Sequence, residues 1–206
     1  MNEPERVPSA DAWRRVKPYE NVDRPRTRTI TAPQARELLK KLQPALRDLA
    51  LASLYTGLRL GEILALRVED LQGKSVHVRH SKSGRSRSVP LTAEGLEFFT
   101  KAAEDKDDSG RLFEPVSRIN VSRGMRTACT AAKIAPPATF HDLRRSYGSL
   151  LLNSGASADA IQELLGHADL RMTRRTYAHM LDKTLRRTVT RHLPNFADRA
   201  PKTRHQ

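Results

Sequence analysis

Strand-forming patterns occur in only one short part of the sequence, and this restricts the fold more than any other feature. Polar and apolar residues alternate with a period of two in residues 75–79 and again in residues 86–90. The polar segment 81–85 between them contains a glycine and is typical of a hairpin turn. Elsewhere the apolar residues recur with helical spacing. The sequence therefore predicts a mainly α-helical chain with one small antiparallel β-sheet.

The segments with helical spacing are bounded by residues that commonly begin and end helices. Thr31 and Gln34 fit a capping box, and Pro33 suits the first turn of a helix. Gly57 is a residue type that commonly ends a helix. We expect helices at about 31–42, 44–56, 60–66, 92–103, 120–133, 139–153, 157–165, 171–180 and 182–192.

The charge of the chain favours a polyanionic partner. Its 206 residues carry 37 Lys and Arg against 23 Asp and Glu, a formal net charge of +14. There is no signal-peptide pattern and no apolar run near the length of a membrane span, so we expect a cytoplasmic protein without a membrane partner. The single cysteine, Cys129, cannot form an internal disulfide. The sequence has no zinc-spaced Cys/His cluster and no magnesium-type acidic pair, so we expect neither a metal nor a cofactor.

Arg59 is the first candidate for contact with an anion. It follows Gly57 at the start of a predicted helix, where backbone N–H groups already favour a negative charge. Glu62, one turn later, is placed to pair with it and fix its rotamer. An ordinary surface arginine is the alternative.

The predicted hairpin carries Lys82 together with Arg79, Arg85 and Arg87. Four cations on one hairpin could lie in a DNA groove, and a lysine at its tip could donate a proton to a leaving oxygen. The alternative is a solvated turn with no function, because turns are usually polar.

His141 and Arg144 lie at positions i and i+3 of one predicted helix and therefore share a face. Leu143, Tyr147 and Leu150 form the neighbouring apolar face, which we expect to point toward the core. The two polar residues would then lie at the edge of a cleft. A core-packed histidine beside a surface arginine is an equally good interpretation of this pair alone.

Two further candidates follow near the C-terminus. His167 comes directly after a predicted helix end at Gly166, where capping a carbonyl is its simplest role. Tyr177 follows Arg174 and Arg175, and nearby positive charge favours the ionised phenolate. Most tyrosines are instead packing residues with a solvated hydroxyl.

The order of these elements resembles the tyrosine recombinase (phage integrase) family. The resemblance covers residues 25–192 and depends on five separated motifs: Thr56-Gly-Leu-Arg59, the lysine-bearing hairpin, His141-Asp-Leu-Arg144, Leu165-Gly-His167 and Tyr177-Ala-His179. Arg145 and Ser146 stand where many members have His and Thr.

The resemblance implies a role for each motif residue. Arg59 and Arg144 would contact the scissile phosphate, and Lys82 would protonate the leaving 5′-oxygen. His141 and His167 would assist, and Tyr177 would become attached to the 3′-phosphate. Glu62 matches the acidic residue that supports the site. The remaining cations that we expect to contact DNA are Arg79, Arg85, Arg87, Arg145, Arg174 and Arg175.

The expected protein is thus a site-specific recombinase or integrase that acts on double-stranded DNA, as a homotetramer on paired sites. We expect it in the cytoplasm and, if it comes from a bacterium or a phage, at the nucleoid. We expect residues 1–28 to be a linker or arm, similar to the exit linker of the family's N-terminal DNA-binding domain. Residues 29–182 would form the catalytic domain, and the basic tail 183–206 would dock on a neighbouring protomer or on its own domain. Two other functions fit the sequence: a truncated fragment that only binds DNA, and a type IB topoisomerase-like nicking-closing enzyme.

Overall fold

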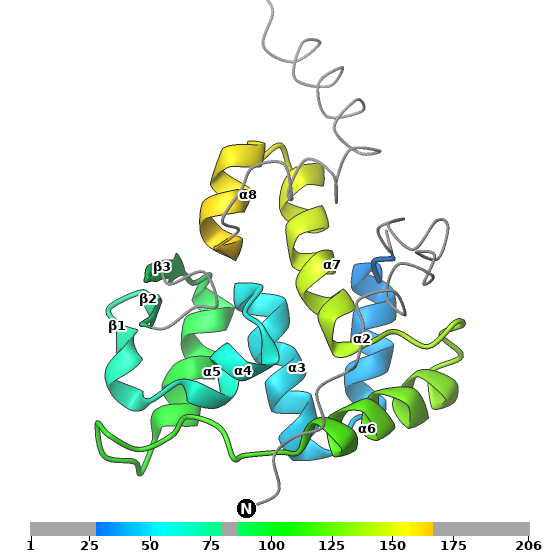
Figure 1. Ribbon diagram of the computed structural model, residues 1–206, viewed down its shortest axis with the longest axis horizontal. Coiled ribbons are helices and arrows are strands. Elements are labelled where there is room, and N and C mark those ends of the chain that lie inside the picture. The colour runs from blue at the N-terminus through cyan, green and yellow to red at the C-terminus, as the bar shows by residue number, and fades with distance from the viewer. Residues whose placement is uncertain (1–27, 80–85, 167–206) are drawn as a thin grey trace, which may run out of the picture.

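The computed structural model describes residues 28–79 and 86–166, and in these ranges it is mainly helical with one small sheet (Figure 1). The elements in chain order are α2 (Ala32–Lys41), α3 (Pro44–Thr56), α4 (Leu60–Ala65), the 3-10 helix η1 (Val68–Asp70), β1 (Leu71–Gln72), β2 (Ser75–Val78), β3 (Arg87–Pro90), α5 (Ala93–Ala103), α6 (Arg118–Ala131), α7 (Phe140–Asn153) and α8 (Ala158–Leu165). The predicted fold class is therefore confirmed. The expected turn 81–85 and the expected helices 171–180 and 182–192 lie outside the described residues.

Side-chain caps explain where most of these helices begin. Thr31 forms the predicted capping box, in which its amide donates to Gln34 Oε1 at 2.9 Å. Thr92, Ser117 and Ser157 each accept a hydrogen bond from the amide three residues further on. Because Ser117 is the cap, α6 begins at Arg118, earlier than the predicted residue 120.

The sheet is a three-stranded antiparallel meander in the order β1-β2-β3. Val76 of β2 lies opposite Val89 of β3, and both are fully buried. β1 was not among the predicted strands. It spans only Leu71–Gln72, which is too short to show an alternating pattern, and it pairs with β2 across the turn at Gly73.

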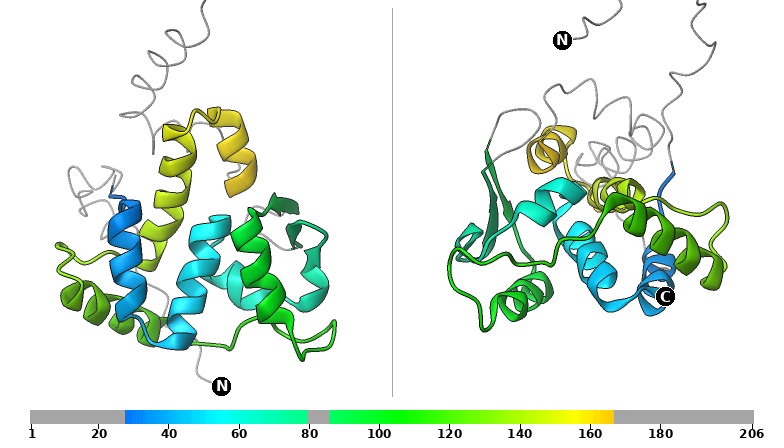
Figure 2. Two further views of the ribbon diagram at one scale, coloured as in Figure 1. Left: turned by 180° about the vertical axis from the view of Figure 1, so that it is seen from behind. Right: turned by 60° about the horizontal axis from the view of Figure 1, so that its bottom comes forward.

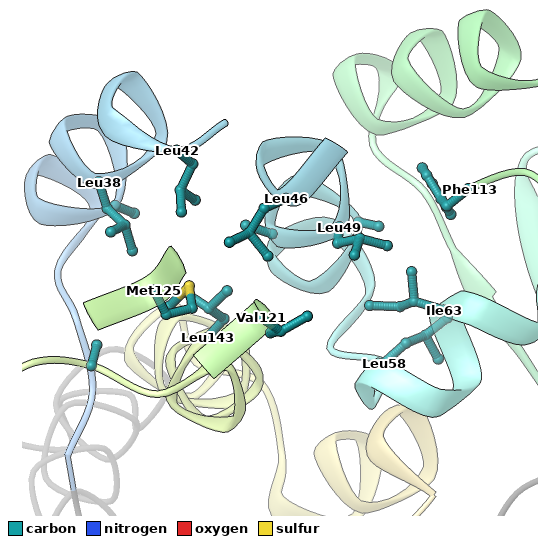
Figure 3. Packing of buried hydrophobic residues seen from close by; sticks show 14 of the residues in the cluster. Leu38, Leu42, Leu46, Leu49, Leu58, Ile63, Phe113, Val121, Met125 and Leu143 are labelled. Carbon is teal, nitrogen blue, oxygen red and sulfur yellow. The ribbon is translucent and has the colours of Figure 1, made fainter. Parts of the chain in front are cut away.

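The main core lies between the helices and centres on α3. Figure 2 shows α3 between α2 and α5, while α7 packs against it from a third side. Figure 3 shows leucines of α3 facing side chains from the other helices across this core. The labelled residues are Leu38, Leu42, Leu46, Leu49, Leu58, Ile63, Phe113, Val121, Met125 and Leu143.

A second, smaller cluster joins α7 to α8. Leu152 packs there with Ile161 and Leu165, and Tyr147 covers its edge. The prediction that Leu150 points toward the core is wrong, because this side chain is 42% exposed. The C-terminal half of α7 extends beyond the main core, and α8 covers a different side of the helix (Figure 1).

Gly57, which ends α3 as predicted, is also a point of close approach between elements. Its φ of 67° is in the left-handed region, and an added Cβ would lie 2.4 Å from Cδ1 of Tyr147 and 2.8 Å from a methyl carbon of Leu165. Gly57→Ala is therefore expected to lower the free energy of unfolding by about 2–4 kcal/mol, from backbone strain plus overpacking. Urea denaturation measures this loss.

Gly73→Ala is the matched control, because Gly73 has a similar φ of 58° but no heavy atom within 4 Å of the added Cβ. Its expected loss is about 1–2 kcal/mol, from backbone strain alone. If the two variants were equally stable, the contact of Gly57 with α7 and α8 would not matter for folding.

Candidate active site

Arg59 is held at the start of α4 by a carboxylate one turn later. It occupies the N-cap position, where its amide donates to Glu62 Oε2 at 2.9 Å and its Nη1 donates to Glu62 Oε1 at 2.9 Å. The Arg59 side chain is 29% exposed, whereas that of Glu62 is buried. Arg59 and Glu62, three residues apart, therefore hold the Arg59 guanidinium at the protein surface, and the buried Glu62 carboxylate sets its orientation.

Glu62 lies among three guanidinium groups. Arg87 donates to it through Nη2 at 2.9 Å and Nη1 at 3.3 Å, and Arg144 Nη1 lies 3.8 Å from Oε2. Burial raises the pKa of Glu62, but the hydrogen bonds from Arg87 and from the Arg59 amide outweigh it and hold the pKa below its ordinary value. The carboxylate stays ionised, and the cluster keeps an excess of positive charge.

Arg144 projects from α7 and is only 2% exposed. Its Nη1 donates to the Gly57 carbonyl at 2.7 Å, and its Nη2 donates to the Leu165 carbonyl. These carbonyls lie at the C-terminal ends of α3 and α8, where helix carbonyls lack intrahelical partners and the helix dipole is negative. One guanidinium therefore holds the ends of two helices together against a third helix.

His141 lies in the first turn of α7. Thr139 and Asp142 begin this helix with a capping box, in which the Thr139 amide donates to Asp142 Oδ2 at 2.8 Å. The histidine is exposed, but the protein around its ring and the charges of Arg145 and Arg144 lower its pKa below the ordinary value. A neutral imidazole, which can accept as well as donate a hydrogen bond, is thus favoured at neutral pH.

A cleft of about 800 Å³ brings these groups together between α4, α6 and the start of α7. Arg59, Glu62, His141 and Arg144 all line it. The structure thus places four of the predicted site residues around one opening, although they come from segments far apart in the sequence. Within 28–79 and 86–166, no group of three His, Cys, Asp or Glu side chains is arranged to hold a metal ion.

Six of the other predicted site residues lie outside the part of the chain that the structure describes. Lys82, His167 and Tyr177 lie outside the described residues, as do the expected DNA contacts Arg85, Arg174 and Arg175. Their roles stay predictions.

Arg79 and Arg145 are each paired with carboxylates of their own domain. Arg79 donates to Asp70 Oδ1 at 2.6 Å and to Glu69 Oε1 at 2.8 Å, and its side chain is still partly exposed. Arg145 donates to Asp142 Oδ1 at 3.1 Å. Both remain predictions as DNA contacts, because a partly exposed guanidinium has further donors to offer a phosphate.

Arg87, expected as one of the hairpin cations that contact DNA, is buried in the structure, and its role as a DNA contact is not tested. Arg87 is the first residue of β3, and its side chain is buried against Glu62 and the Leu164 carbonyl. The signal was present in the sequence, because a period of two places Arg87 on the same face as the buried Val89. The alternation in residues 86–90 predicted a strand, but the charge of Arg87 led to the expectation that its side chain contacts DNA.

The fold is that of a tyrosine recombinase catalytic domain. The crystal structure of XerA recombinase matches with a TM-score of 0.64 and 26% identity, over 82% of this chain and 66% of that one. The catalytic domain of bacteriophage HP1 integrase matches with a TM-score of 0.63 and 24% identity, over 80% of this chain and 94% of that one.

Sequence comparison gives the family directly. The model of the phage integrase family matches residues 28–184, and the chain therefore belongs to this family of tyrosine recombinases. Tyrosine recombinase XerC of Lactobacillus delbrueckii subsp. bulgaricus is 30% identical over 165 residues, which cover 72% of this chain and 55% of the relative. A tyrosine recombinase of Pseudothermotoga lettingae is 30% identical over 183 residues, or 81% of this chain and 63% of the relative. The chain thus spans a little more than half the length of these curated relatives.

Proposed function

We propose that this chain acts as the catalytic domain of a site-specific recombinase or integrase, which cleaves and rejoins duplex DNA through a 3′-phosphotyrosine. One observation carries the proposal: Arg59, His141 and Arg144 line the same cleft in a member of the phage integrase family. The family's curated relatives are recombinases, and the net charge of +14 suits a polyanionic substrate.

The cleft is suited to a phosphate whose negative charge grows during reaction. Arg59 and Arg144 would donate to the non-bridging oxygens, and charge-assisted bonds of this kind are short and strong. Both guanidiniums are already fixed by protein partners, so little reorganisation is needed when the transition state forms. His141, favoured as a neutral imidazole, would donate a hydrogen bond to the phosphate or accept a proton.

The proposed reaction has two steps, and each replaces one phosphodiester bond by another. The Tyr177 oxygen attacks phosphorus and gives its proton to His141, while the 5′-oxygen leaves and takes a proton from Lys82. A 5′-hydroxyl of the partner strand then attacks the phosphotyrosine and returns its proton to Lys82, while the released tyrosine takes its proton back from His141. One phosphodiester is broken and one is formed, so the exchange needs no external source of energy.

A pool of nicked duplexes with a short randomised segment beside the nick tests the proposal, because a short recognition sequence can be selected from it without being known beforehand. We expect a covalent protein–DNA adduct on a denaturing gel, and sequencing of the trapped DNA would identify the site. Retention of duplex without any adduct would instead indicate a fragment that only binds DNA. Relaxation of supercoiled plasmid without strand exchange between recovered sites would indicate a topoisomerase-like enzyme.

Assembly belongs to the same proposal. We place the reaction in the cytoplasm at the nucleoid, in a homotetramer on two recovered sites, with residues 183–206 of one protomer docked on the next. No helix in the described part of the chain is long and apolar enough to cross a membrane. Sedimentation of the protein with a duplex that carries the recovered site measures the number of protomers per complex.

DNA affinity is expected to fall steeply with salt. Each phosphate that the protein neutralises releases counterions, so the logarithm of the binding constant should change with the logarithm of salt concentration by about −0.9 per contact. Fluorescence anisotropy of a labelled duplex at a series of salt concentrations measures the slope. A binding constant that did not change with salt would mean that the excess of basic residues does not contact the DNA.

A further inference from the structure

Arg87 connects two parts of the site that no chain segment connects directly. From the start of β3 it donates to both carboxylate oxygens of Glu62, at 2.9 Å and 3.3 Å. Its Nε donates at the same time to the Leu164 carbonyl at 2.9 Å. The first contact reaches α4, and the second reaches the last turn of α8.

The contact with Glu62 extends to Arg59. The same Glu62 oxygens accept the Arg59 amide and the Arg59 guanidinium, so the carboxylate lies between a buried arginine and a cleft-lining one. A shift of the carboxylate would move the group that orients Arg59. The planar guanidinium of Arg87 suits this task, because its fork matches both carboxylate oxygens.

The contact with α8 places Arg87 beside the residue that precedes His167. The C-terminal carbonyls of α8 are divided between two arginines, with Leu164 bound to Arg87 and Leu165 bound to Arg144. An added Cβ on Gly166 would lie 2.7 Å from Arg87 Nη1. Figure 1 shows α8 next to β3, as this close approach requires.

We propose that Arg87 is a positioning residue, which holds Glu62, and through it Arg59, in a fixed relation to the C-terminal end of α8. The inference rests on the proposed function and deepens it. Arg87 itself does not contact DNA because, unlike Arg144, it is not among the residues that line the cleft, and its donors point to Glu62 and Leu164. Its effect on strand cleavage is indirect.

The test compares Arg87→Lys with a matched control, Arg111→Lys. Lysine keeps the charge but cannot bind both Glu62 oxygens and the Leu164 carbonyl at once. Arg111 also donates to a carbonyl at a helix end, that of Leu64, but it lies outside the cleft lining. Both variants are assayed on the nicked duplex recovered by the pool selection, for duplex affinity and for single-turnover adduct formation.

We expect Arg87→Lys to slow adduct formation by roughly 10²-fold, the scale of loss that a displacement near 1 Å produces. Duplex affinity should stay close to that of the unchanged protein, and Arg111→Lys should match it in both measurements. Affinity that falls in step with rate would make Arg87 a DNA contact and overturn the proposal. Unchanged rates in Arg87→Lys would overturn it as well.

A second substrate separates this role from an effect on the hairpin before β3. A 5′-bridging phosphorothiolate duplex has a leaving group that needs no proton. We expect Arg87→Lys to form the adduct more slowly than the unchanged protein on both duplexes, and by the same factor. Rescue by the phosphorothiolate would assign the defect to leaving-group protonation and overturn the proposal.

Two further measurements keep the test independent of this variant and of the proposed function. Gly166→Ala retains Arg87 but crowds its Nη1 and, at a φ of 61°, also strains the end of α8, so it should show the same loss of rate together with a loss of stability like that of Gly73→Ala. Hydrogen exchange needs no substrate: Arg87→Lys should speed exchange in residues 158–166 and at the Arg59 amide, but not in α2. If the unchanged protein forms no adduct, the proposed function fails, and hydrogen exchange alone tests the positioning role of Arg87. Unchanged exchange in residues 158–166 and at the Arg59 amide would overturn that role.

Discussion

Tyr177→Phe is expected to abolish covalent attachment to DNA while leaving duplex affinity almost unchanged. The substitution removes one hydroxyl, which is the proposed nucleophile, and alters no charge. Unchanged and substituted proteins incubated with the recovered nicked duplex, and then separated on a denaturing gel, measure attachment. Anisotropy of the same duplex measures affinity, and this should stay within the error of the unchanged protein.

Tyr147→Phe is the matched control. Tyr147 packs at the edge of the cluster between α7 and α8, and burial raises the pKa of its hydroxyl, which makes the phenolate harder to form. The control should therefore still form the adduct. An adduct in Tyr177→Phe that disappeared in Tyr147→Phe would move the nucleophile to α7 and overturn the proposed chemistry.

The parts of the fold that the sequence predicted depend on local signals. Thr31 and Thr92 cap helices with their own side chains, and Gly57 ends α3 because it can adopt a positive φ. The alternating pattern predicted β2 and β3 because one face of each strand is buried. Each signal lies within a few residues of its effect, so a single sequence is enough to read it.

The site could be predicted only as a set of residue types. That Arg59, His141 and Arg144 share a cleft depends on the packing of α4 and α7, which residue spacing does not encode. The burial of Arg87 depends on Leu164, a partner 77 positions away. The charge of Arg87 is typical of a surface residue, whereas its place in the alternating pattern matches the buried Val89. The exposure of Leu150 also depends on tertiary packing, because the 3.6-residue period does not show where a helix extends past the core.

The arrangement around Arg144 links stability to the proposed chemistry. Its guanidinium lies at the cleft, yet the same donors hold the carbonyls of Gly57 and Leu165. Arg144→Ala should therefore lower the free energy of unfolding by about 1–3 kcal/mol, because buried carbonyls lose a charged donor. Glu62 stays paired with Arg59 and Arg87, which limits the loss. Urea denaturation measures this effect separately from activity.

Arg144→Ala should lower the rate of DNA cleavage far more than it lowers the affinity for duplex DNA. One phosphate contact among many changes binding little, but the charge that grows in the transition state needs a fixed donor, worth roughly 10²–10³ in rate. Single-turnover adduct formation and duplex affinity, measured on one recovered duplex, give the two values. Leu38→Ala, which opens a cavity in α2 away from the cleft, controls for destabilisation alone and should keep the unchanged rate while it stays folded. Equal losses of rate and affinity in Arg144→Ala would make Arg144 a docking residue. Its buried position argues against that, because a guanidinium fixed by two helix ends can reach only a phosphate that enters the cleft.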